Sequence, residues 1–116
     1  MKNITFEKYQ GNGNDFVIID SRGNDLYKNY KTNKIFDIKK ICNRQFGIGA
    51  DGVIFIEEPN EDNYAKMIIF NSDGSEAQMC GNGIRCLVEY LHVNDSMNNK
   101  NIEYKIETKA GLKIAK

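Results

Sequence analysis

The sequence predicts a single α+β domain in which β-strands outnumber helices, and three observations lead to this class. Its 116 residues are enough for one ordinary domain but not for two. With 41% hydrophobic and 28% charged residues, the chain has the composition of a globular protein that buries a core. Most of the patterned segments are short and strand-like, and two are helical. Mostly strands with two helices is typical of an α+β domain.

The first half of the chain is predicted to hold two strands and one helix. Strands are expected at residues 4–10 and 16–20, separated by a corner rich in glycine and asparagine. Residues 21–34 are polar and rich in turn-forming side chains, so we expect an exposed loop there. A short helix with one apolar side is predicted at residues 36–45, and the glycines of residues 47–52 end it.

The second half is predicted to add a strand pair, a longer helix and a hairpin. Strands are expected at 53–57 and 64–71, joined by an acidic turn around Pro59. A helix follows because four apolar residues recur at i, i+3, i+4 and i+7. They are Ile84, Leu87, Val88 and Leu91. Segments 102–108 and 112–115 read as a terminal hairpin, and its uncovered edge suggests that the chain is one half of something larger.

Charge and hydropathy exclude several classes of function. The 16 basic and 16 acidic residues balance, and no basic block exceeds two residues, so we expect no nucleic-acid or anionic-lipid partner. The longest purely apolar runs are four residues, as in 16–19, far too short for a membrane span. Because the first residues also lack the apolar stretch of a secretory signal, a cytoplasmic location is expected.

The chain's cysteines predict neither a disulfide framework nor a metal site. There are three, Cys42, Cys80 and Cys86, an odd number without C-x-x-C spacing, and the single histidine is His92. Zinc needs four ligands at compact spacing, so no metal is expected. His92 is interpreted as a solvated residue in the last turn of a helix.

The run Gly47–Gly52 matches the G-x-G-x-x-G pattern of dinucleotide-binding proteins. That site requires a strand before the glycines and a helix after them, because the pyrophosphate binds at the helix N-terminus. Here the predicted helix comes first and the strand second. We therefore interpret the glycines as a helix end followed by a tight turn, and we expect no nicotinamide cofactor.

The segment around Cys80 is the most informative part of the chain. Cys80 lies just before the predicted helix, where unpaired backbone N–H groups and the helix dipole favour negative charge. A thiol there is shifted toward the thiolate, which suits a general acid or base near neutral pH. The neighbouring glycines would let a ligand carboxylate approach the backbone. The alternative, in which Cys80 is a small turn residue and Asn82 a helix N-cap, remains open on spacing alone.

Three segments of the chain together resemble the diaminopimelate epimerase family. They read G-N-G-N-D-F near the start, N-R-Q-F-G-I-G-A-D-G in the middle, and F-N-S-D-G-S-E-A-Q-M-C-G-N-G-I-R-C beyond it. Their order and approximate distances are those of the family's N-terminal domain. The resemblance covers essentially all of residues 1–116 and a little under half of a complete family member. It therefore implies a truncated N-terminal domain, one half of the two-domain fold, with strands wrapped around a central helix.

The resemblance implies a function and roles for individual residues. Members of this family are isomerases that need no pyridoxal phosphate or other cofactor, and they interconvert L,L- and meso-diaminopimelate in lysine and peptidoglycan-precursor biosynthesis. Two cysteines, one from each domain, act on opposite faces of the substrate's α-carbon. Cys80 matches the first of them, while Gly81 and Asn82 match backbone contacts to the carboxylate. Asn14 and Asn71 match side chains that hold the substrate.

The resemblance also implies what this chain lacks and leaves alternatives open. The second catalytic cysteine belongs to the C-terminal domain, so residues 1–116 alone are expected to be inactive or nearly so. Full-length members are commonly homodimers. A related cofactor-free proline racemase or hydroxyproline epimerase is one alternative, although those proteins typically have histidine where Asn82 stands. A non-catalytic half-domain that self-associates is another, and a redox sensor using Cys80 and Cys86 is a third.

Overall fold

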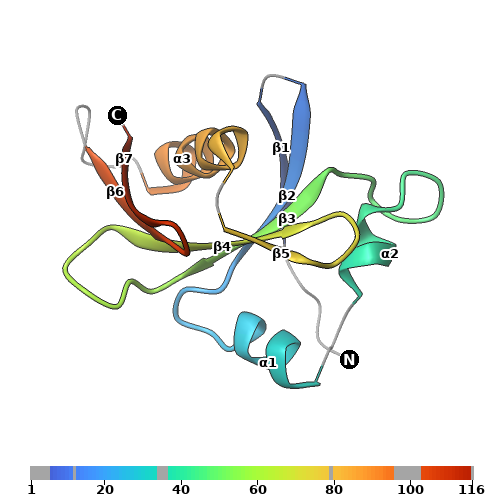
Figure 1. Cartoon of the computed structure of the whole chain (residues 1–116), viewed down its shortest axis with the longest axis horizontal. Coiled ribbons are helices and arrows are strands. Elements are labelled where there is room, and N and C mark those ends of the chain that lie inside the picture. The colour runs from blue at the N-terminus through green and yellow to red at the C-terminus, as the bar shows by residue number, and fades with distance from the viewer. Residues whose placement is uncertain (1–5, 12, 34–36, 79, 96–102, 116) are drawn as a thin grey trace.

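The computed structural model describes residues 6–11, 13–33, 37–78, 80–95 and 103–115. These residues form a mixed β-sheet with helices on both of its faces (Figure 1). The strands are β1 (Glu7–Gly11), β2 (Asn14–Asp20), β3 (Gly52–Glu57), β4 (Ala65–Asn71), β5 (Glu76–Ala77), β6 (Tyr104–Thr108) and β7 (Gly111–Ala115). The helices are α1 (Leu26–Asn33), α2 (Ile38–Cys42) and α3 (Gly81–Asp95). The predicted α+β class, a single domain of mostly strands around a central helix, is confirmed.

The strands follow the spatial order β1-β2-β3-β4-β6-β7, and the short β5 also pairs with β4. Two neighbouring pairs are parallel, β2 with β3 and β4 with β6. The remaining pairs are antiparallel. A parallel neighbour requires a crossover connection, because a tight turn can only reverse the chain. The segment between β2 and β3 carries α1 and α2, and the segment between β4 and β6 carries α3.

The central strands are apolar on both faces and divide the core into two layers. Side chains of successive strand residues point to opposite faces, so Ile54 and Phe55 of β3 belong to different layers. Ile54 packs in the layer that contains Leu87 of α3. Phe55 packs on the other face with Tyr30 of α1 and Ile38 of α2. The central strands therefore carry α3 on one face and α1 and α2 on the other.

The expected exposed loop at residues 21–34 is wrong, because this segment contains α1. Although most side chains of α1 are polar, two tyrosine rings form an apolar contact with the sheet. The ring of Tyr30 lies 5.5 Å from that of Phe55, and the ring of Tyr27 lies 5.1 Å from the same phenylalanine. Such aromatic contacts can offset a weak helix pattern, but only the folded sheet supplies Phe55 as their partner. The domain therefore has three helices among its described residues rather than two.

Other element boundaries differ by a few residues. The predicted helix at 36–45 is only Ile38–Cys42, because Asn43 has extended backbone with ψ 124° and ends it. The longer helix begins at Gly81 and continues to Asp95, and the short strand β5 was not expected. Within the terminal hairpin, β6 and β7 pair as predicted, and His92 is an exposed residue near the end of α3. Parts of the predictions at residues 4–5, 34, 36 and 102 lie outside the described residues.

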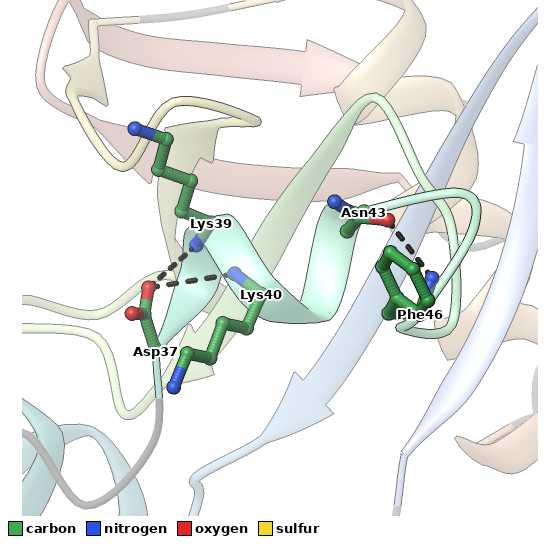
Figure 2. Close-up of a pocket in the computed structure, with 5 residues that line it drawn as sticks. All are labelled: Asp37, Lys39, Lys40, Asn43 and Phe46. Carbon is green, nitrogen blue, oxygen red and sulfur yellow. Dashed lines mark hydrogen bonds between the residues drawn. The ribbon is translucent and has the colours of Figure 1, made fainter.

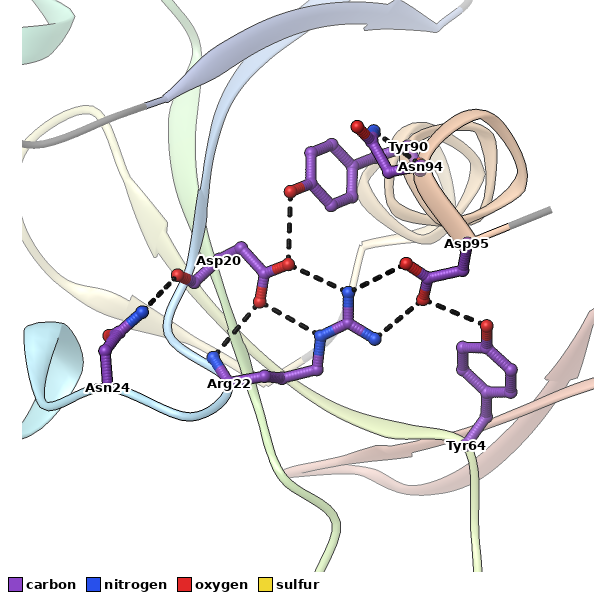
Figure 3. Close-up of polar contacts among 7 residues, drawn as sticks. All are labelled: Asp20, Arg22, Asn24, Tyr64, Tyr90, Asn94 and Asp95. Atoms are coloured by element: carbon purple, nitrogen blue, oxygen red, sulfur yellow. Dashed lines mark hydrogen bonds and ion pairs between the residues drawn. The ribbon is translucent and has the colours of Figure 1, made fainter. Parts of the chain in front are cut away.

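An ion network joins the C-terminal end of α3 to the end of β2 (Figure 3). The Arg22 guanidinium donates to both oxygens of Asp20, at 3.0 and 2.8 Å, and to both oxygens of Asp95, at 2.7 and 3.3 Å. Tyr90 donates to Asp20 and Tyr64 donates to Asp95. Burial raises the pKa of Asp20, but the hydrogen bonds from Arg22 outweigh it, so the net pKa lies below the ordinary value. Two-sided bidentate pairing of this kind fixes the helix end against the sheet.

We expect Arg22→Gln to lower the free energy of unfolding by about 2 kcal/mol at pH 7, since it leaves two partly buried carboxylates without their cation. Because Asp20 has a depressed pKa in the folded protein, the stabilisation is complete above its unfolded pKa of about 4 and is lost as the pH falls through the folded value. The difference between wild type and variant should therefore shrink below about pH 4. Urea denaturation at several pH values measures it.

The control is Lys109→Gln, which removes an exposed ion pair with Glu76 at 3.5 Å. Exposed pairs of this kind contribute little, so its effect should stay within about 0.5 kcal/mol at every pH. An equal effect of the two variants would contradict the structural role of the Arg22 network.

Candidate functional site

Cys80 lies at the entry of α3, where it serves as the N-cap residue. Its carbonyl accepts the hydrogen bond from the N–H of Ile84 at 2.9 Å, and the helix itself begins at Gly81. The thiol side chain is partly buried against the core layer below α3. The first N–H groups of a helix have no partner within it, and here they belong to Gly81 and the residues that follow. The alternative with Asn82 as N-cap is therefore wrong, since Asn82 lies inside the first turn.

Gly83 explains how closely the start of α3 approaches the sheet. A Cβ atom added at Gly83 would lie 2.8 Å from Cδ1 of Ile69 and 3.5 Å from Cβ of Cys80. A side chain there would have to displace Ile69, so glycine permits this packing distance. At Gly81, in contrast, an added Cβ would meet nothing within 4 Å. The helix entry thus combines a tightly packed inner side with an open outer side next to Cys80.

Three strand ends meet at the edge of the sheet near this helix entry. The parallel pairing aligns Phe16 of β2 with Gly52 of β3, and the antiparallel pairing aligns Gly52 with Asn71 of β4. Asn14 is the first residue of β2, Asp51 immediately precedes β3, and Asn71 is the last residue of β4. The sheet register therefore places side chains from distant parts of the sequence along one edge.

The structure brings Asn14 and Asn82 into direct contact. The Nδ2 group of Asn82 donates a short hydrogen bond to Oδ1 of Asn14. On its other side, Nδ2 of Asn14 donates to Oδ2 of Asp51 at 3.4 Å. Two of the predicted substrate-binding residues are thus neighbours, 68 positions apart in the sequence. Their contact connects the first turn of α3 to the beginning of β2.

Asn71 is placed on the same sheet edge but in a separate set of contacts. Its Nδ2 group donates to Oγ of Ser75 at 3.1 Å, and its backbone N–H donates to the carbonyl of Ser75 at 2.7 Å. These bonds close the turn that leads from β4 to β5, and Gly74 completes it with a φ of 92°. The Asn71 side chain is exposed. In this structure the Asn71 amide therefore stabilises the turn between β4 and β5.

A charged cluster beside Asn14 was not singled out from the sequence. Arg44 donates to both oxygens of Asp15, at 3.2 and 2.8 Å, and to Oδ1 of Asp51 at 3.1 Å. Lys8 approaches Asp15 at 3.1 Å. The hydrogen bonds from Arg44, with help from Lys8, hold the pKa of Asp15 well below its usual range although burial opposes them. The available signal was the presence of Arg44 and Asp51 in the middle motif, to which no residue roles were attached.

Comparison with known proteins explains why these residues occur together. The sequence model of diaminopimelate epimerase matches residues 6–115 of the chain. The chain belongs to the diaminopimelate epimerase family. A curated diaminopimelate epimerase from Prochlorococcus marinus (strain NATL1A) is 55% identical over 112 residues, which cover 97% of this chain and 39% of that protein. The protein of that name from Methanocaldococcus jannaschii is 45% identical over 113 residues, which cover 97% of this chain and 37% of its own length.

Family membership is shown for the chain, which spans less than two fifths of these curated relatives. Among solved structures, a phenazine biosynthesis protein of the PhzF family from Bacillus anthracis superposes with a TM-score of 0.66. It is 23% identical, and the match covers 98% of this chain and 36% of that one. This likeness concerns the fold, which corresponds to about one third of the larger structure. The diaminopimelate epimerase family is an isomerase family, and the resemblance drawn from the three motifs is confirmed.

The three cysteines of this family member differ in burial, and Cys80 is the one that is not fully buried. Cys86 and Cys42 are buried, with 2% and 5% of their surface exposed. Burial raises the pKa of the Cys86 thiol to about 11 and also raises the pKa of Cys42. Both are therefore poor acids and bases near neutral pH. Within the part of the chain that the structure describes, no group of three or more His, Cys, Asp or Glu side chains could hold a metal ion.

We expect iodoacetamide at pH 8 to modify Cys80 first in the folded chain. With a pKa of about 11, only roughly one Cys86 thiol in a thousand is ionised at that pH, and its burial blocks the reagent further. Peptide mass spectrometry after timed labelling should show Cys80 reacting at least about a hundredfold faster than Cys86 or Cys42. The urea-unfolded chain, in which all three should react alike, is the control. Equal labelling of Cys86 and Cys80 in the folded chain would contradict the assignment.

A pocket of about 430 Å³ lies apart from the Cys80 region, beside α2 (Figure 2). Its lining consists of Asp37, Lys39, Lys40, Asn43 and Phe46. The Asp37 side chain caps α2 by accepting from two backbone N–H groups, and Asn43 accepts from the N–H of Phe46. None of the site residues predicted from the sequence lines this pocket.

No helix among the described residues is long and apolar enough to cross a membrane.

Proposed function

We propose that this chain is the N-terminal domain of a diaminopimelate epimerase and supplies one of its two acid/base cysteines. The observation that carries the proposal is the position of Cys80 at the open entry of α3, beside the contact between Asn82 and Asn14. The family match supports the reaction class, and the match to relatives more than twice as long supports the assignment to one domain. The substrate is diaminopimelate, interconverted between its L,L and meso forms without a cofactor.

The chemistry requires a base for a very weakly acidic proton. In the proposed reaction the Cys80 thiolate removes the proton from the α-carbon, and the electron pair of the C–H bond moves toward the α-carboxylate. A thiol on the opposite face then returns a proton to the α-carbon with inverted configuration. In the reverse direction the two sulfur atoms exchange roles. General acid–base catalysis by positioned groups contributes roughly 10² to 10⁴ to an enzyme's acceleration, so the loss of either cysteine should slow the reaction by a comparable factor.

The carboxylate that gains negative charge must be held by donors already in place. We propose that backbone N–H groups of Gly81 and Asn82, at the positive end of the α3 dipole, bind it. The open space above Gly81 supports this, because it leaves the backbone accessible to a ligand. The side chains of Asn14 and Asn71 would bind further polar groups of the substrate. For Asn71 this requires the amide to exchange its present bond to Ser75 for one to the ligand.

The opposing thiol must come from outside residues 1–116. Cys86 belongs to the same helix as the Cys80 entry and is buried, so it cannot face the other side of a substrate bound at Cys80. We propose that a second domain, which the relatives' greater length would accommodate, supplies the second cysteine. On this proposal the complete enzyme operates in the cytoplasm, where the thiols stay reduced, and its biosynthetic role is that of the family.

The test transplants this chain onto the remainder of a relative. Residues 1–116 would replace the matching segment of the Prochlorococcus marinus protein, to which they are 55% identical over 112 residues. We expect the chimera to interconvert L,L- and meso-diaminopimelate and to incorporate deuterium at the α-carbon in heavy water, while residues 1–116 alone do neither at ordinary enzyme rates. Full turnover by the isolated chain would refute the half-site proposal, and a folded but inactive chimera would count against the assigned function.

A further inference from the structure

The side-chain amide of Asn14 is engaged at both of its ends. Its Oδ1 accepts from Nδ2 of Asn82, and its Nδ2 donates to Oδ2 of Asp51 at 3.4 Å. Asn14 is also partly buried. An amide can adopt two orientations that exchange donor and acceptor. Its neighbours therefore decide which end faces α3.

Asp51 can decide this orientation because an ionised carboxylate only accepts hydrogen bonds. It attracts the Nδ2 end of Asn14 and leaves the Oδ1 end for Asn82. Asn82 must then present its own Nδ2 group to Asn14, which directs its carbonyl oxygen elsewhere. If Asn14 were reversed, two donors would face each other between β2 and α3, at the cost of an unmade hydrogen bond. The position of the Asp51 carboxylate thus influences the first turn of α3 through Asn14.

Asp51 is itself held in place from two directions. Its Oδ2 also accepts from the backbone N–H of Asp15 at 2.9 Å, and the backbone N–H of Asp51 donates to the carbonyl of Asp15 at 2.8 Å. Its Oδ1 accepts from Arg44 at 3.1 Å, and Arg44 is anchored in turn by Asp15. The carboxylate is therefore bound to the backbone of the strand whose first residue is Asn14. A path of contacts leads from Arg44 through Asp51 and Asn14 to Asn82.

We propose that Asp51 is a positioning residue, which orients the Asn14 amide and through it the Asn82 side chain, and that Arg44 supports it. Neither residue needs to touch the substrate for this role. The consequence of this positioning role for catalysis rests on the proposed function, because the orientation of Asn14 affects the reaction only if Asn14 and the first turn of α3 bind the substrate. The orientation itself is a property of the ligand-free chain. It can therefore be tested without any activity.

The experiment records the side-chain amide signals of Asn14 and Asn82 by NMR in the complete 116-residue chain. We compare wild type with Asp51→Asn, which keeps the size but replaces one of the two acceptor oxygens by an NH₂ donor. The matched control is Asp62→Asn, the same change at an exposed aspartate in the connection between β3 and β4. In Asp51→Asn the NMR signals of the Asn82 Nδ2 protons should shift. These protons should also exchange with heavy water roughly three- to tenfold faster, the range expected for losing one hydrogen bond. Asp62→Asn should leave both unchanged.

Equal shifts and exchange rates in the two folded variants would overturn the proposal. If Asp51→Asn does not fold, Arg44→Gln provides the test, because the Arg44 side chain is 56% exposed and its loss is tolerable. Exchange at Asn82 should then rise a few-fold and fall back in Arg44→Lys, which restores a cation. If the Asn82 Nδ2 protons of Arg44→Gln exchange at the wild-type rate, the proposed path from Arg44 through Asp51 to Asn82 is refuted.

A titration of the same samples with L,L-diaminopimelate separates this proposal from the proposed function. Binding by wild type that is weakened by Asp51→Asn and not by Asp62→Asn supports both proposals. Unchanged binding by Asp51→Asn, despite altered Asn82 signals, would overturn the catalytic consequence of the positioning role. Absence of binding by wild type would count against substrate binding by this domain, while the amide signals would still decide the orientation.

Discussion

Replacing Cys80 with serine is expected to reduce epimerisation by the chimeric enzyme at least about a thousandfold. Serine nearly preserves the size of the side chain, and the N-cap bond from Ile84 uses only the backbone carbonyl of residue 80. The hydroxyl, however, is a far weaker acid than a thiol and cannot supply a basic oxyanion at neutral pH. The loss should therefore appear in kcat, with little change in KM. Epimerisation rates and α-deuterium incorporation measure it.

Cys86→Ala is the matched control for this prediction. Cys86 lies in the same helix, but it is buried and its pKa is raised to about 11, so we expect it to take no part in proton transfer. Its removal costs some packing and should leave kcat within roughly twofold at a temperature where the protein stays folded. A thousandfold loss in Cys86→Ala, or near-normal turnover in Cys80→Ser, would show that the wrong cysteine has been assigned.

Gly52→Ala is expected to destabilise the domain by about 3 kcal/mol, the largest effect on folding that we predict for a single methyl group. An added Cβ would lie 2.5 Å from the carbonyl oxygen of Phe70 and 3.0 Å from the ring of Phe16. The first contact is with backbone in the neighbouring strand, which cannot rotate away as a flexible side chain could. To relieve it, β3 must shift at the residue that follows Asp51. Urea denaturation followed by circular dichroism measures the loss.

The control for Gly52→Ala is Gly81→Ala. At Gly81 the added methyl group meets nothing within 4 Å, and the residue lies at the start of a helix. This variant should be neutral or more stable by up to about 1 kcal/mol, because alanine lowers the entropy of the unfolded chain. If the two alanine variants proved equally stable, the close approach of β3 and β4 at Gly52 would not be a constraint on the fold.

The sequence was sufficient for the features that depend on local pattern. The apolar stripe of α3, the apolar runs of β3 and β4, and the terminal hairpin follow from the spacing of side chains along one segment. The position of Cys80 before a helix is of the same kind, since N-terminal signals are local. Residues 21–34 were misjudged because α1 owes its stability to Tyr27 and Tyr30 packing against β3. A pattern along one segment contains no information about such a partner.

The arrangement of the candidate site depended on tertiary structure. From the sequence alone, Asn14 is one asparagine in a turn-rich corner, and its role there came only from the family resemblance. The parallel pairing of β2 with β3 places it beside Asp51, and the packing of α3 on the sheet brings Asn82 to its other side. Local sequence therefore determined most of the elements, although not α1 or β5, and it determined the position of Cys80 before α3. Strand register and helix packing, which depend on contacts between distant segments, decided which side chains meet around it.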